Sequence, residues 1–186
     1  FIIAALFFIK SASSSNQIDS LKSLINNTSN DSSYIQTLIA LSDLYSYQNI
    51  DSAIYYGKLA KRKAEEIKDY NSVANANIEL GWNHYSLGNY KDALNYYYDA
   101  MSIFKKLKNI KGENRAKGNL GTVYKELGDF DMALKFYFDY LSYVETLGNK
   151  SSIAVGTGNI GLIYIELKDL EKSEEYMQKS LNLYME

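Results

Sequence analysis

The fold is decided by residues Leu120–Leu141, which read LGTVYKELGDFDMALKFYFDYL, because this pattern recurs at a fixed distance along the chain. Gly121 is preceded by Gly81 and followed by Gly161, each 40 residues away. The same spacing relates three further sets: Leu87, Leu127 and Leu167; Tyr124 and Tyr164; Ala93 and Ala133. Self-similarity at a period of roughly 20–50 residues is typical of a solenoid, in which each repeat packs on its neighbours.

Each repeat contains two helical patterns separated by a short turn. Residues 120–127 place Leu, Gly, Tyr and Leu on one helix face, and Gly128 ends that helix. Asp129 can then cap a second helix, whose apolar stripe lies within residues 130–141. A turn this short predicts an antiparallel helix pair. Because they are small, Gly121 and Ala133 are predicted points of closest helix approach.

This stretch resembles a tetratricopeptide repeat, whose pattern runs L-G, Tyr, G-D-[YF], Ala, aromatic, Ala. Leu80–Ala100 matches nearly throughout, and Leu120–Tyr140 departs only at Tyr140, which replaces a small residue. The first and last repeats are looser. Lys168 replaces the turn glycine, and Ser42–Ala53 is one residue shorter than its counterpart, which predicts a shorter turn. The resemblance implies an all-α, right-handed solenoid of about four antiparallel helix pairs.

The repeat is longer than is usual for this family, which has about 34 residues per repeat. We expect longer second helices to take up the extra length, as in the longer-repeat subclass of some cytoskeletal and signalling adaptors and many bacterial sensor proteins. The predicted organisation is a short capping helix and polar linker over 17–32, followed by repeats at about 33–70, 71–110, 111–150 and 151–186. The predicted helices are 33–47, 51–67, 71–87, 90–107, 112–127, 130–147, 151–167 and 170–186, the last of which we expect to continue beyond the sequence.

Residues 1–16, FIIAALFFIKSASSSN, differ from the repeats. The apolar run Phe1–Ile9 is shorter than the roughly 20 residues that a membrane-spanning helix needs. Ser11 and Ser13 could occupy the −3 and −1 positions of a signal-peptidase site. The segment therefore predicts the rear of a secretory signal peptide and an extracytoplasmic location, periplasmic or secreted. A partial membrane anchor and a buried helix of a cytoplasmic protein are the alternatives.

The composition argues against several classes of function. A net charge of −2 gives no basic footprint of the kind that nucleic-acid binding requires, so we expect no nucleic-acid partner. Cysteine is absent from the sequence, so it carries no information about the redox environment. Lysine runs within 58–63 and 105–111 are interpreted as solvated helix faces, with an anionic partner site as the alternative.

Candidate catalytic and cofactor motifs have simpler explanations in the repeat. Residues 156–161 spell G-x-G-x-x-G, but that fingerprint needs a preceding strand, and the repeat already accounts for two of the glycines. His84 is the sole histidine and stands where other repeats have tyrosine, so we interpret it as a packing residue. Asp51, Asp129 and Asp169 are interpreted as helix caps. We expect a non-catalytic protein with no metal and no cofactor.

The aromatic triplets Tyr96–Tyr98 and Phe136–Phe138 lie 40 residues apart. Consecutive residues on a helix cannot all face one way. We expect Tyr97 and Tyr137 in the core and their neighbours between repeats.

The remaining positions of each first helix form a separate stripe, and in the resembled family these helices line a concave groove that receives peptides or helices. Packing between neighbouring first helices is the alternative use of this stripe. Trp82 and Arg115 are predicted anchors because both residue types are enriched at binding hot spots. The stripes include Gly118 and, in the last repeat, Val155 and Gly158. The predicted groove residues are Asn75, Ile78, Trp82, Tyr85, Arg115, Thr122, Lys125, Leu162 and Ile165.

The sequence thus predicts a module that binds a peptide or protein segment. The alternative is the extracytoplasmic sensing region of a larger bacterial signalling protein, with a histidine kinase, cyclase or transcription-regulator output. A membrane is expected only through the N-terminal segment or a segment downstream. The identity of the partner and the oligomeric state are left open.

Overall fold

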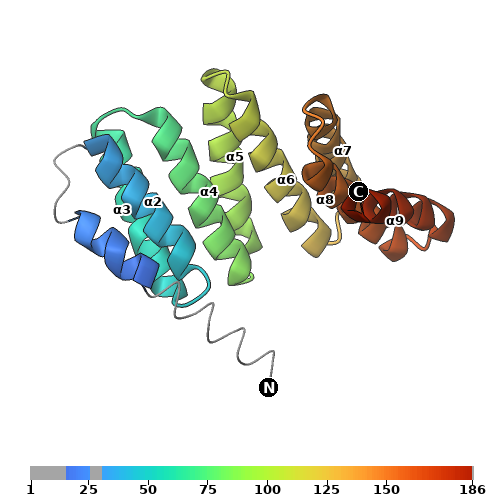
Figure 1. Ribbon diagram of the computed structural model, residues 1–186, viewed down its shortest axis with the longest axis horizontal. Coiled ribbons are helices and arrows are strands. Elements are labelled where there is room, and N and C mark those ends of the chain that lie inside the picture. The colour runs from blue at the N-terminus through green and yellow to red at the C-terminus, as the bar shows by residue number, and fades with distance from the viewer. Residues whose placement is uncertain (1–15, 26–30, 186) are drawn as a thin grey trace. The chain divides into compact units, whose positions relative to one another are not determined.

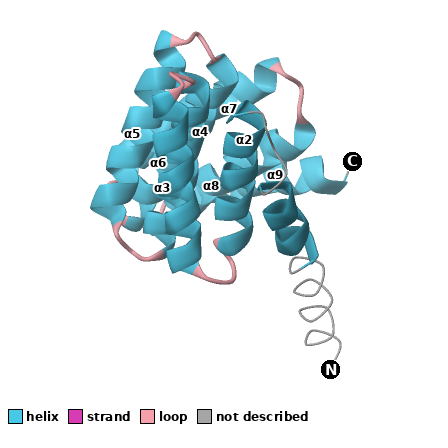
Figure 2. Cartoon of the chain, turned by 90° about the vertical axis from the view of Figure 1, so that its left-hand side faces the viewer, coloured by secondary structure: helices cyan, strands magenta, loops and turns pink. Residues whose placement is uncertain are grey.

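The computed structural model describes residues 16–25 and 31–185, and every regular element in these ranges is a helix (Figures 1 and 2). The chain is an all-α solenoid of helical repeats, as predicted. The bounds of the last eight helices agree with the predicted ones to within two residues. The predicted signal segment lies outside the described residues, apart from its last position. After a helix over 16–25, the elements are α2 (Asp31–Tyr45), α3 (Ile50–Glu66), α4 (Tyr70–Ser86), α5 (Tyr90–Lys106), α6 (Ile110–Glu126), α7 (Phe130–Thr146), α8 (Lys150–Glu166) and α9 (Leu170–Met185).

A shorter period of 20 residues lies within the 40-residue repeat. From α3 to α8 every helix has 17 residues, so first and second helices are equally long. The expectation of longer second helices is therefore wrong. A residue with positive φ follows six of the helices at this regular spacing: Lys68, Gly88, Lys108, Gly128, Gly148 and Lys168.

The turn between α6 and α7 shows how two helices are joined by so few residues. Gly128, at φ +75°, donates its N–H to the Lys125 carbonyl at 3.1 Å, and the Asp129 N–H reaches the Tyr124 carbonyl at 3.0 Å. These two bonds close α6 as a Schellman motif. The Asp129 carboxylate then accepts the Met132 N–H at 3.1 Å, which caps α7. One residue therefore takes part in ending one helix and starting the next.

The predicted caps are partly right. Asp129 and Asp169 cap α7 and α9, since each carboxylate accepts a backbone N–H of its helix. Asn89 is the N-cap residue of α5, but its side chain makes no capping bond to that helix. Asp51 is not a cap: Asn49 accepts the third backbone N–H of α3 at 2.9 Å, and Asp51 lies in the first turn of the helix.

The first repeat departs from the others at its turn and at its helix contact. The connection 46–49 has four residues and α2 ends early, so the missing residue comes from the helix and the predicted shorter turn is wrong. Ser42 stands where later repeats have glycine, and Gly57 stands where they have tyrosine or methionine. A Cβ on Gly57 would lie 2.9 Å from Leu80, so Leu80 of α4 fills the space that the missing side chain leaves.

The chain divides into two compact units, residues 1–87 and 88–186, each described here by itself. In the first unit, Leu38, Ala60 and Ala76 form a fully buried cluster that joins α2, α3 and α4. In the second unit, α7 lies between α6 and α8 along the chain and packs against both. The buried cluster there consists of Ala133, Tyr137, Leu141, Val144, Ile160 and Ile163.

Aromatic residues join successive repeats in the second unit. The Phe136 ring stacks on Tyr124 with centroids 5.7 Å apart, and Tyr98 meets Phe136 edge-on at 6.3 Å. The Tyr98 and Tyr124 hydroxyls share a hydrogen bond of 2.8 Å. Tyr97 and Tyr137 are each 1% exposed, so the predicted division of the two triplets between the core and the inter-repeat contact is confirmed at these positions.

Candidate protein-binding faces

In the first unit, the predicted residues of α4 lie at different depths. Trp82 and Tyr85 are partly exposed, with ring centroids 5.4 Å apart. Asn75 is also partly exposed, whereas Ile78 is only 4% exposed. The surface that α4 offers therefore consists of two aromatic rings and one amide, with Ile78 buried beneath them.

In the second unit, α6 carries a polar and basic stripe. Arg115 is exposed, at the position equivalent to Asn75. Thr122 is hydrogen-bonded to the Gly118 carbonyl at 3.2 Å and to the Tyr137 hydroxyl at 3.0 Å. Lys125 pairs with Glu126 at 3.2 Å. Thr122 is thus held by its own repeat, while Arg115 extends toward solvent.

The equivalent stripe on α8 is aliphatic. Val155, Leu162 and Ile165 are 45%, 42% and 46% exposed. The three lie on one face of the helix, at intervals of seven and three residues. Such a concentration of exposed aliphatic side chains on one helix face is uncommon for a purely solvated surface.

Sequence reasoning missed Tyr140, a partly buried residue of α7. A Cβ on Gly118 of α6 would lie 3.5 Å from the Tyr140 ring, and one on Gly156 of α8 would lie equally close. The ring therefore occupies the space between the two first helices of this unit. The signal was available in the sequence: a large residue at a small-residue position, together with two glycines at its neighbours. In the first unit the equivalent residues are Leu38, Ala60 and Ala76, where the large side chain comes from the first helix.

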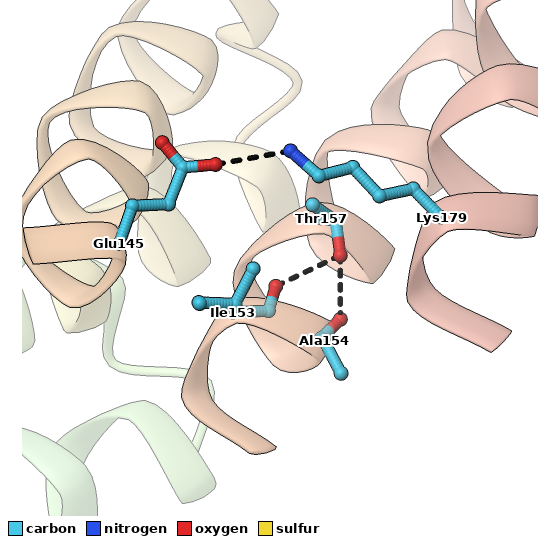
Figure 3. A network of polar contacts seen from close by, with 5 residues as sticks. All are labelled: Glu145, Ile153, Ala154, Thr157 and Lys179. Atoms are coloured by element: carbon cyan, nitrogen blue, oxygen red, sulfur yellow. Dashed lines mark hydrogen bonds and ion pairs between the residues drawn. The ribbon is translucent and has the colours of Figure 1, made fainter. Parts of the chain in front are cut away.

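Polar contacts link α7, α8 and α9 at the end of the described chain, as Figure 3 shows. Glu145 of α7 and Lys179 of α9 form an ion pair of 3.0 Å. Within α8 the buried Thr157 hydroxyl is hydrogen-bonded to the Ile153 carbonyl at 2.8 Å and to the Ala154 carbonyl at 3.0 Å. These contacts hold helices together and leave no group poised for chemistry.

The residues considered for catalysis or ligand binding have structural surroundings. Residues 156–161 lie inside α8, where Gly161 faces Met177 and Gly158 faces Ser180. His84 lies partly buried on α4. Within 16–25 and 31–185, the side chains include no group of three that could hold a metal ion. None of the helices in the same ranges is both long and apolar enough to cross a membrane.

Comparison with family models decides the identity of the repeats. Residues 11–100 match the model described as the SusR N-terminal TPR domain, and residues 115–138 and 157–184 match the tetratricopeptide repeat model. The chain belongs to the tetratricopeptide repeat family. Tetratricopeptide repeats are generally non-catalytic and bind proteins or peptides, so the chain is a protein-binding repeat module.

Solved tetratricopeptide and related structures share the fold at low sequence identity. BtubC from P. vanneervenii superimposes with a TM-score of 0.80 at 19% identity, covering 91% of this chain and 74% of that one. A STAND signal-transduction ATPase with a tetratricopeptide repeat sensor, from Pyrococcus horikoshii, gives 0.82 at 22% identity, covering 99% of this chain and 29% of that one. Aspartyl phosphate phosphatase F from Bacillus subtilis gives 0.81 at 17% identity, covering 92% and 49%. The chain thus spans less than half the length of the last two. No curated protein sequence matches it significantly.

Proposed function

We propose that this tetratricopeptide chain is a non-catalytic module that binds a peptide or protein segment along the first helices of its repeats. The observation that carries the proposal is the exposed aliphatic stripe of α8. Each of Val155, Leu162 and Ile165 keeps more than two fifths of its surface in water. Burying apolar surface is favourable by about 25 cal/mol per Å², so a partner that covers this stripe gains binding free energy.

The α4 face supports the same function in the first unit. Trp82 and Tyr85 present adjacent rings at the surface. Aromatic side chains of this kind frequently dominate binding energies when a partner surrounds them. Arg115 of the second unit is the proposed anchor for an acidic group, because its guanidinium can form bidentate bonds with a carboxylate.

The proposal of a non-catalytic role is supported by the arrangement of the titratable groups. An active site usually brings a nucleophile, an acid or base and a charge-stabilising group together in one pocket. In the described parts of the chain the acidic side chains act as helix caps or pair with lysines at the surface, as Asp169 does with Lys172 at 3.0 Å.

The test is the affinity of peptides selected against the wild-type chain from a random display library. We expect Trp82→Ala and Arg115→Ala together to weaken selected peptides by at least about 2 kcal/mol, roughly 30-fold. The matched control replaces Tyr55 and Lys135, an exposed aromatic and an exposed lysine on second helices, by alanine. Far-UV circular dichroism confirms that each variant is folded. Equal affinities for wild type and the Trp82/Arg115 variant would show that the first helices are not the binding face.

The second candidate function is the extracytoplasmic sensing region of a larger bacterial signalling protein. It is supported by the signal-like composition of residues 1–16 and by the match of residues 11–100 to an N-terminal tetratricopeptide domain. The test is to express the full-length gene and sequence the mature N-terminus. Cleavage near Ser13, together with a hydrophobic stretch of about 20 residues and an output domain downstream, would favour the sensor. An uncleaved chain in the cytosolic fraction would reject it.

A further inference from the structure

The two first helices of the second unit differ in chemistry at equivalent stripe positions. On α6 three of four positions are cationic, whereas the positions 40 residues later on α8 are a serine and three aliphatic residues. We call these eight residues, with Tyr140, the two-rail surface. The α6 rail is Lys111, Arg115, Thr122 and Lys125, and the α8 rail is Ser151, Val155, Leu162 and Ile165.

Tyr140 shows that the two rails are neighbours. Its ring contacts α6 at Gly118, a position on the stripe, and α8 at Gly156, next to Val155. Since α6 and α8 both run antiparallel to α7, they run in the same direction. The N-terminal end of one rail therefore lies beside the N-terminal end of the other, with one aromatic ring between them.

Both rails are accessible to a partner. Lys111 and Arg115 are exposed on α6, as are the three aliphatic residues on α8. Gly118 and Gly158 occupy the middle of the two stripes and carry no side chain, so a partner can approach the helix backbone closely there. From Val155 to Ile165 the α8 rail is about 15 Å long, at 1.5 Å per helical residue.

The charges of the α6 rail are not explained by the stability of the helix. Lys111 lies in the first turn of α6, where the helix dipole disfavours a cation. The nearby carboxylates Glu113 and Asp139 pair with Lys117, at 3.2 and 3.5 Å, and Lys117 is not part of the rail. Positive charge is therefore concentrated at the N-terminal end of the rail, because at the other end Lys125 is paired with Glu126.

We infer that the two-rail surface binds a peptide segment with carboxylates along one flank and aliphatic side chains along the other. The inference rests on the proposed function and adds the chemistry of the partner to it. The carboxylates would pair with Lys111 and Arg115, and the aliphatic flank would cover the α8 rail. Tyr140 would lie beneath the segment, at the boundary between its two flanks.

The test uses the full chain with labelled Ile, Leu and Val methyl groups, titrated with three synthetic peptides of about 12 residues. One peptide combines glutamate and leucine flanks at helical spacing, the second replaces glutamate by lysine, and the third replaces leucine by serine. We expect the first peptide to shift the methyl signals of Val155, Leu162 and Ile165 and to bind at least about tenfold more tightly than the other two. Its affinity should fall as salt is raised, because exposed charge pairs are screened.

Matched variants separate the two rails. Lys111→Glu should weaken the glutamate–leucine peptide about tenfold, whereas Lys135→Glu, the same charge change on α7, should leave its affinity unchanged. Leu162→Ser should weaken the peptide at low and high salt alike. Leu181→Ser, at an exposed leucine of α9, is the control for that change.

The outcomes distinguish the inference from the proposed function. If the lysine–leucine peptide shifts the same methyl groups with equal affinity, the face binds peptides but the acidic partner is wrong. An equal loss from Lys111→Glu and Lys135→Glu would also overturn the acidic partner, because the effect would then be one of net charge. If none of the three peptides shifts the α8 methyl groups, the inference is overturned, whereas the proposed function is decided separately by the display-selected peptides.

Discussion

Two glycines one turn apart on α6 should respond oppositely to the same substitution. A Cβ on Gly121 would lie 2.9 Å from two carbons of the Tyr137 ring, whereas a Cβ on Gly118 would lie 3.5 Å from Tyr140. The first distance is shorter than real side chains tolerate, and the second is ordinary van der Waals contact. The Tyr137 ring cannot easily move away, because it is 1% exposed and its hydroxyl is hydrogen-bonded to Thr122.

The magnitudes follow from two free-energy terms. Replacing a helical glycine by alanine favours the helix by about 1 kcal/mol at either site. Overpacking adds a penalty of about 1–3 kcal/mol at Gly121 alone. We therefore expect Gly118→Ala to be stabilised by up to about 1 kcal/mol and Gly121→Ala to be destabilised by about 1 kcal/mol. Because the helix term is common to both variants, their difference of about 2 kcal/mol measures the packing term.

Urea unfolding followed by far-UV circular dichroism checks this expectation. With a urea dependence of about 1–3 kcal/mol per molar, the two midpoints should differ by roughly 1 M. The wild-type midpoint should lie between those of the two variants. If Gly121→Ala proves as stable as Gly118→Ala, the contact of Tyr137 with the α6 backbone does not limit the size of residue 121, and the reasoning fails.

Two further effects are expected. Lys168 has a φ of +60°, which costs a non-glycine residue about 1–2 kcal/mol, so Lys168→Gly should raise the urea midpoint; an unchanged or lower midpoint would contradict this. Burial, followed by the hydrogen bond with Tyr124, raises the pKa of Tyr98 above its ordinary value near 10. Since a raised pKa favours the neutral hydroxyl in the folded state, the stability linked to Tyr98 is present below pH 10 and is lost as the pH rises above it. Tyr98→Phe should therefore lose stability less steeply than wild type between about pH 10 and 12, and parallel pH profiles would refute the assignment.

Much of the fold could be predicted because each repeat states its own packing rules. The spacing of Gly81, Gly121 and Gly161 fixed the period, and the turn residues Gly128 and Asp129 fixed the helix ends. Such residues are nearly irreplaceable at their positions, since a left-handed turn favours glycine and an N-cap favours a short polar side chain. The pattern is therefore readable without any knowledge of the tertiary structure.

The errors came from features that two or more elements decide together. Asp51 is as good a capping residue as Asn49, and only the backbone shows which of them precedes the helix. Tyr140 looked like a departure from the family pattern because its effect depends on glycines in two other helices. A core accepts such exchanges when the total volume is conserved, and a single-helix pattern does not reveal them.

The stripe residues of the first helices are informative for the opposite reason. Packing restricts Gly121 and its equivalent Gly161 to the same small residue, but it leaves residues 115 and 155, also 40 apart, to differ as arginine and valine. A difference that the fold does not require points to what the surface contacts. In the second unit the change from a cationic α6 to an aliphatic α8 therefore points to a partner with two unlike flanks. A partner with uniform chemistry would leave one of the two helices uncomplemented.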